Sequence, residues 1–141
     1  MLCIISVAEV MMGFDNHTGH FMASIKIKPH GPEPDRRSKP AWNGMRWGFK
    51  YAEDVEKFGE QAGVYDVFPE FLDENGNSIK NDVPCTGKLN AVMHALSPEL
   101  HFPRIKIGTK FYHYDGRFIV AVGIVTKLSV DDNRERNGFS F

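Results

Sequence analysis

Histidines and cysteines are the side chains in this sequence best suited to catalysis or metal binding, and their spacing favours neither role. His17 and His20 lie three residues apart, which would suit two zinc ligands, but neither a nearby cysteine nor a second pair closes a tetrahedral site. His113 lies between Tyr112 and Tyr114 in an expected strand, where a histidine more often packs than acts as a general base. The other histidines are His30, His94 and His101.

Other reactive motifs are also incomplete. Asp73, Asn75 and Asn77 resemble the start of a calcium loop, but the glycine follows one residue after Asn75 instead of at the sixth position, so a turn is favoured. Cys85 has no adjacent base to activate its thiol. The sequence contains neither a phosphate-binding Gly-x-x-x-x-Gly-Lys-Ser/Thr loop nor a Gly-x-Ser-x-Gly elbow. We therefore expect a protein that is not an enzyme and needs no metal or cofactor. An enzyme would require a pocket that brings His94, His101 or His113 beside a carboxylate.

Charge is distributed in blocks along the 141 residues, although the net charge is only -1. Residues 26–50 carry seven basic and two acidic side chains, residues 51–82 carry two basic and nine acidic, and residues 83–128 carry six basic and two acidic. This pattern is compatible with ordinary solvated faces or with a bipolar surface that meets partners by charge. Two cysteines and an apolar N-terminus without a leading basic residue favour a reduced, cytoplasmic setting and no membrane association.

The elements that would position these side chains are short strands. Alternation over 21–28 places Phe21, Ala23, Ile25 and Ile27 on one face. A second alternating segment, 45–51, places its aromatic residues on one face and Arg46, Gly48 and Lys50 on the other. Further strands are expected in the ranges 64–72, 90–96, 104–107, 110–114 and 118–128, with turns at 75–76 and 115–116.

One acidic helix interrupts the strands. Apolar residues recur at helical spacing over 52–62, and Gly63 is the expected C-cap. The acidic side chains in this segment are Glu53, Asp54, Glu56 and Glu60. Many short strands with one helix indicate an all-β fold, a closed antiparallel Greek-key-like barrel of about six strands. We expect an N-terminal extension over 1–19, the barrel over 20–130 and a polar tail over 131–141.

Several segments resemble, in order, the C-terminal β-barrel domain (domain three) of translation elongation factor Tu. They are Phe21-Met22-Ala23-Ser24-Ile25, Ser38-Lys39-Pro40-Ala41-Trp42, Gly44-Met45-Arg46-Trp47-Gly48-Phe49, Val83-Pro84-Cys85-Thr86-Gly87 and the hairpin over 108–128 with its Asp115-Gly116 turn. The resemblance implies a non-catalytic barrel that contacts tRNA. By position it implies RNA contacts from Arg36, Arg37, Lys39, Arg46, Lys110 and Arg117, whose charges suit phosphate oxygens.

Two functions follow. The first is an RNA- or tRNA-binding, translation-associated module that uses these basic residues. The second is a protein-interaction module, an adaptor or an inhibitor, that uses the acidic 52–62 segment. The second is motivated by that segment and by a proline-rich stretch over 29–40, which stands where the family has a Gly-Gly-Arg-His-Thr loop.

Overall fold

The computed structural model describes residues 19–32, 40–116 and 118–128. Two short helices and a single 3-10 turn accompany six strands. The strands are β1 (Gly19–Ile27), β2 (Gly48–Tyr51), β3 (Val67–Phe71), β4 (Lys88–Ala95), β5 (Lys110–Asp115) and β6 (Phe118–Lys127). The helices are α2 (Ala52–Phe58), the 3-10 turn η1 (Gly59–Gln61) and α3 (Pro98–His101).

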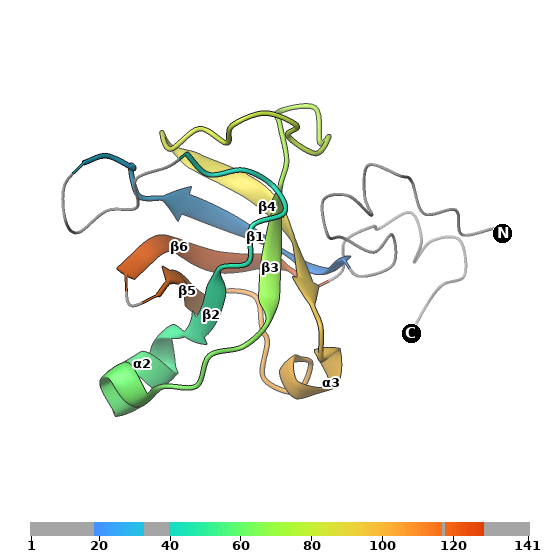
Figure 1. Cartoon of the computed structure of the whole chain (residues 1–141). Helices are drawn as coiled ribbons and strands as arrows, with labels where there is room; N and C mark the ends of the chain where they lie inside the picture. The colour runs from blue at the N-terminus through green and yellow to red at the C-terminus, as the bar shows by residue number, and fades with distance from the viewer. Residues whose placement is uncertain (1–18, 33–39, 117, 129–141) are drawn as a thin grey trace, which may run out of the picture.

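All six strands form one antiparallel sheet in the order β2-β5-β6-β1-β4-β3. The sheet curls into a half-barrel, so that its two edge strands, β2 and β3, come round to the near side of the molecule while β1 and β6 lie behind them (Figure 1). The all-β class is therefore as predicted, but the expected continuous closed barrel is not formed.

The edge strand β2 is bridged to the segment just before the other edge strand, β3. The backbone N–H of Phe49 donates to the carbonyl of Tyr65 over 3.1 Å, and the N–H of Tyr65 donates to the carbonyl of Phe49 over 2.8 Å. Further along the edge of β3, the side-chain amide of Asn43 takes the place of a strand. It accepts from the N–H of Phe71 at 2.7 Å and donates to its carbonyl at 2.9 Å. Asn43 thus satisfies part of an edge that would otherwise remain unpaired.

The predicted alternation of the first strand is confirmed, because Phe21, Ala23, Ile25 and Ile27 are all buried in the core. Close packing between β5 and β6 depends on Gly123. A Cβ atom at this position would clash with the ring of Phe111, its cross-strand partner. The glycine lets that ring lie flat across the neighbouring strand.

Turn predictions are confirmed at Gly76 and Gly116, whose φ angles are 83° and 63°. The acidic helix is also present, but its predicted C-cap is wrong. The helix ends at Gly59, which adopts a φ of 58°, before the chain reaches Gly63. The strand predicted over 104–107 is wrong too, because Arg104 and Ile105 both donate backbone bonds to His101 in the turn that follows α3.

Four of the predicted RNA-binding residues lie outside the described residues: Arg36, Arg37, Lys39 and Arg117. Residues 1–18 of the expected 1–19 extension and the tail over 131–141 lie outside them as well, whereas Gly19 begins β1. Within the described part of the chain, no helix is long and apolar enough to cross a membrane.

Candidate functional site

The outer surface of β1 and β4 brings two lysines directly opposite each other. Lys26 and Lys88 are cross-strand partners, and both are exposed because Ile25, Ile27 and Leu89 turn toward the core. Side chains on directly opposed residues have Cβ atoms about 5 Å apart, and like charges in this arrangement are destabilising. Neither lysine forms an ion pair with any described residue.

The same face continues across β6 to β5. Lys26 faces Val122, and Val122 faces Tyr112, so these residues form one row with Lys88 across four strands. In the adjacent row Lys110 is opposite Ile124, which is 43% exposed. We call the surface formed by Lys26, Lys88, Lys110, Tyr112 and Ile124 the lysine face.

Acidic side chains are almost absent from the strands that form this face. β1, β4 and β6 contain no Asp or Glu, and β5 contains only Asp115 at its end, away from Lys110. The ammonium of Lys110 lies 5.6 Å from the centre of the Tyr112 ring. The face thus combines positive charge with an aromatic ring and an exposed aliphatic side chain, as surfaces that bind single-stranded nucleic acid do.

The predicted RNA-binding residues that the structure describes do not come together. Lys110 begins β5, whereas Arg46 lies beside the β5–β6 turn at the other end of that strand, with its guanidinium 4.5 Å from the centre of the Phe68 ring. Lys26 and Lys88 were not predicted as site residues. Alternation identifies Lys26 as exposed, but only the register of β1 and β4 reveals that Lys88 faces it.

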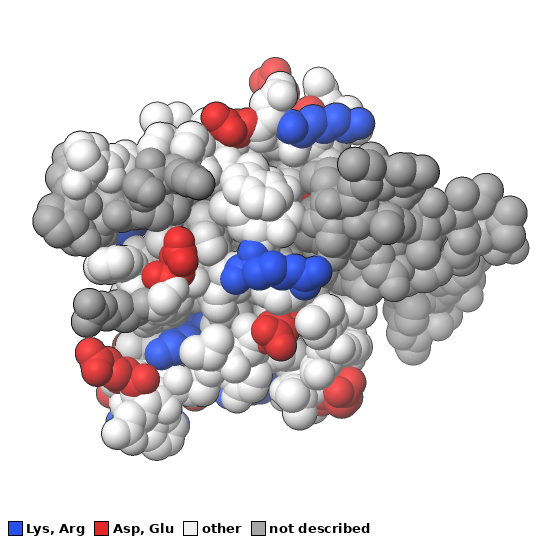
Figure 2. All heavy atoms as spheres, in the orientation of Figure 1, with Lys and Arg blue, Asp and Glu red and all other residues white. Residues whose placement is uncertain are grey.

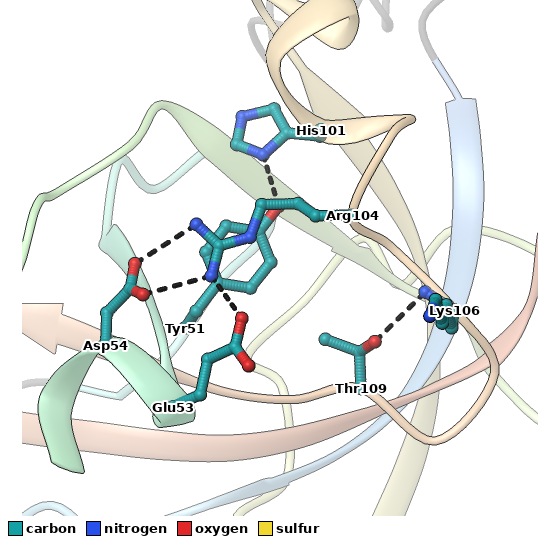
Figure 3. Close-up of polar contacts among 7 residues, drawn as sticks. All are labelled: Tyr51, Glu53, Asp54, His101, Arg104, Lys106 and Thr109. Atoms are coloured by element: carbon teal, nitrogen blue, oxygen red, sulfur yellow. Dashed lines mark hydrogen bonds and ion pairs between the residues drawn. The ribbon is translucent and has the colours of Figure 1, made fainter. Parts of the chain in front are cut away.

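Two of the four acidic residues predicted to bind a partner are paired with an arginine of the same chain. Arg104 donates to both carboxylate oxygens of Asp54, at 3.2 and 3.0 Å, and to Glu53 at 2.5 Å (Figure 3). Its guanidinium also lies 3.6 Å from the centre of the Tyr51 ring. These contacts join α2 to the segment after α3, and the paired carboxylates raise the pKa of Arg104. Glu56 and Glu60 remain exposed, as does Phe58, which is 61% exposed.

Tyr51, whose ring contacts the Arg104 guanidinium, also contacts His101 of α3. Its hydroxyl and Nδ1 of His101 are 2.5 Å apart, and both residues are almost fully buried (Figure 3). Burial raises the pKa of Tyr51 and, together with the nearby Arg104 charge, lowers the pKa of His101. Both groups are therefore neutral near pH 7, and the bond is one between uncharged partners that fixes α3 against β2.

The remaining histidines of interest have structural contacts. His94 pairs with Glu70 across β3 and β4 at 2.8 Å. His113 is fully buried between aromatic rings, where its Nδ1 lies 3.2 Å from the carbonyl oxygen of Gly48 and its Nε2 has no hydrogen-bond partner. Burial lowers the pKa of His113 to about 4. None of these side chains lines the surface cleft that is bordered by Gly48, Val64 and Tyr114.

The sequence matches no known protein family, and none of the curated proteins compared with it is significantly similar. Function must therefore be argued from the described surfaces.

Proposed function

We propose that this chain is a non-catalytic RNA-binding module whose lysine face contacts the phosphate backbone. The observation that carries the proposal is the opposed pair of Lys26 and Lys88, exposed and without a carboxylate partner among the described residues. Such a pair costs folding free energy in the isolated protein. A phosphate bound between or above the two ammonium groups would neutralise their mutual repulsion. The relief of that repulsion would add to the free energy of binding.

The neighbouring residues suit an unpaired stretch of RNA. Ile124 on β6 lies between Lys110 of β5 and the lysines of β1 and β4, and Tyr112 is next to Lys110 on the same face of β5, so bases could rest on them while phosphates meet the ammonium groups. The lysines supply phosphate contacts, which position a nucleic acid without reading its sequence. The role proposed is contact with tRNA or another RNA in the cytoplasm.

The relation to domain three of elongation factor Tu is part of the same proposal. It rests on the order of the resembling segments and is supported by the antiparallel half-barrel with its one-bridge seam at Phe49 and Tyr65. In this proposal the curled sheet serves as that domain's barrel does, as a rigid support for RNA-contacting side chains.

Binding of bulk tRNA, measured by fluorescence anisotropy at low ionic strength, tests the proposal. Replacing both lysines, K26E with K88E, should weaken binding by at least about tenfold, because two phosphate contacts are lost and two repulsive charges are gained. The matched control is K57E with K80E, which makes the same charge change at exposed lysines outside the lysine face. Equal losses in both double variants would mean that only net charge matters, and undetectable binding by the unmodified protein would refute the RNA role.

A second function, binding of a protein partner through the acidic segment, is favoured by one specific observation. Phe58 is 61% exposed on α2 and is flanked by the exposed Glu56 and Glu60. An exposed aromatic residue with charged neighbours is a common interface anchor. The variant F58S with E56K and E60K leaves the Arg104 contacts intact and should abolish capture of a partner from the native host. Unchanged capture would exclude this surface.

A further inference from the structure

A cleft of about 540 Å³ lies over the seam between the two edge strands, on the outside of the sheet. Gly48 is one of the residues that line it, and a side chain at this position would enter space beside Val64. A Cβ atom there would approach Cγ1 of Val64 to 3.0 Å. The cleft falls within the volume range of about 300–1,000 Å³ that is typical of ligand pockets.

The walls of the cleft combine apolar side chains with charged ones, and part of the apolar surface is exposed. Phe68 and Tyr114 contribute aromatic rings from β3 and β5. Val64 and Leu96, which also line it, are 59% and 58% exposed. Large aliphatic side chains that border a hollow and face solvent provide contact area for a ligand that brings its own apolar surface.

The basic and the acidic side chains in and around the cleft differ in the contacts that they make. Two cations near the cleft lie over aromatic rings that line it: Arg46 over Phe68 at 4.5 Å and Lys50 over Tyr114 at 4.7 Å. Lys50 is nearly buried, although alternation predicts an exposed side chain, because η1 folds back and its Glu60 carbonyl accepts from Nζ at 3.4 Å. Basic and acidic side chains are both scattered over the face of the molecule that bears β2 and β3 (Figure 2).

The two carboxylates of the cleft, Asp66 and Asp115, are exposed and form no ion pair with any described residue. They come from opposite walls, one leading into β3 and the other ending β5. A ligand seated between them would meet two carboxylates beside apolar side chains, in a cleft that Arg46 also lines.

We propose that this cleft binds a protein segment in which an arginine or lysine is flanked by apolar residues. The cationic side chain would lie between Asp66 and Asp115, and its apolar neighbours would cover Val64 and Leu96. This site adjoins the lysine face where the rings of Tyr112 and Tyr114 meet, 6.4 Å apart, but its carboxylate Asp115 and Lys110 lie at opposite ends of β5. The protein would thus be able to hold RNA on one surface and a basic, apolar peptide on another.

The test uses an acetylated and amidated Leu-Arg-Leu peptide, titrated into the full chain and followed by the backbone amide resonances. The expected result is saturable shifts at Gly48, Asp66 and Gly116, without corresponding shifts at Lys26 and Lys88. D66N with D115N should weaken binding about tenfold, because each exposed ion pair contributes a few-fold to affinity. The counter-probes Leu-Glu-Leu and Gly-Arg-Gly should bind at least several-fold more weakly.

Filling the cleft provides a second variant. Gly48 does not have a positive φ, so G48L is compatible with the backbone conformation, and the nearest atom to its Cβ belongs to the exposed side chain of Val64 and not to the backbone. It should abolish the shifts. The matched control is G63L, where an added Cβ meets only ordinary contacts with Tyr65 and lies outside the cleft. Unchanged binding by G48L, or binding of Leu-Glu-Leu equal to that of Leu-Arg-Leu, would overturn the proposal.

Discussion

Acid should destabilise this protein through one buried histidine. His113 is fully buried against Trp47, Phe49 and Phe111, none of which titrates, and its contact with a polar group is the one between Nδ1 and the carbonyl oxygen of Gly48. A proton added at Nε2 would create a charge with no partner. The pKa of His113 in the folded protein is accordingly about 4, below its ordinary value of 6.5.

The sign and size of the effect follow from that difference. Between pH 6.5 and 4 the unfolded chain binds the proton and the folded chain does not, so stability falls as the pH falls through this window. Lowering the pH from 7 to 5 should remove about 2 kcal/mol of the free energy of unfolding. Below pH 4 the total loss should level off at about 3 kcal/mol. The lowered pKa of His101 acts in the same direction.

Urea denaturation at pH 7 and pH 5 measures the effect. The variant H113F replaces the imidazole with a non-titrating ring among aromatic neighbours, and its stability should change by about 2 kcal/mol less between the two pH values than that of the unmodified protein. V125A, a core truncation that leaves His113 in place, is the control and should retain the full dependence. If H113F retained the same pH dependence as the unmodified protein, the account of His113 would be wrong.

Three further variants test the packing, each by urea denaturation. G123A should destabilise the protein by about 3 kcal/mol or prevent folding, because its Cβ would clash with the ring of Phe111; a loss below about 1 kcal/mol would contradict this. N43A should cost about 2–3 kcal/mol, because the backbone N–H of Phe71 loses its side-chain partner and the carbonyls of Phe71 and Ile79 each lose one donor; a loss within error would mean that water replaces the amide. R104M, which removes the guanidinium from its bonds to two carboxylates and from the ring of Tyr51, should cost about 1–2 kcal/mol, a loss that shrinks at high salt; the same loss at all salt concentrations would contradict the ion-pair contribution.

The sequence predicted well those features that depend on near neighbours. The face of β1 follows from alternation, and the turn at Gly76 follows from the tolerance of Asn-Gly for positive φ. The β5–β6 hairpin was found for the same reason. In each case the physical cause lies within a few residues, so no knowledge of the rest of the fold is needed.

The errors occurred where distant segments meet. Residues 104–107 have the composition of a strand, but α3 just before them begins with Pro98, and the chain turns so that Arg104 reaches α2. A serine followed by a proline is a helix-start signal that could have indicated this. Lys50 falls on the predicted outer face, yet the folding back of η1 covers it. The bridge between Phe49 and Tyr65 could not be predicted from the sequence either, because it depends on the curvature of the whole sheet.

The candidate RNA site shows the same limit most clearly. Lys110 could be proposed from the sequence, and Lys26 could be recognised as exposed, but the opposition of Lys26 and Lys88 depends on the register between strands far apart in the chain. A shift of one residue would turn one of the two lysines to the other face. A repulsive pair of this kind therefore becomes visible only in the folded structure.

The salt dependence of tRNA binding tests the central claim most directly. The logarithm of the binding constant should fall linearly with the logarithm of salt concentration, and the slope should lessen by about 2 in K26E with K88E, about one unit for each lost phosphate contact. The control K57E with K80E should retain the original slope. An unchanged slope in the lysine-face variant would contradict the assignment of Lys26 and Lys88 as phosphate-binding residues.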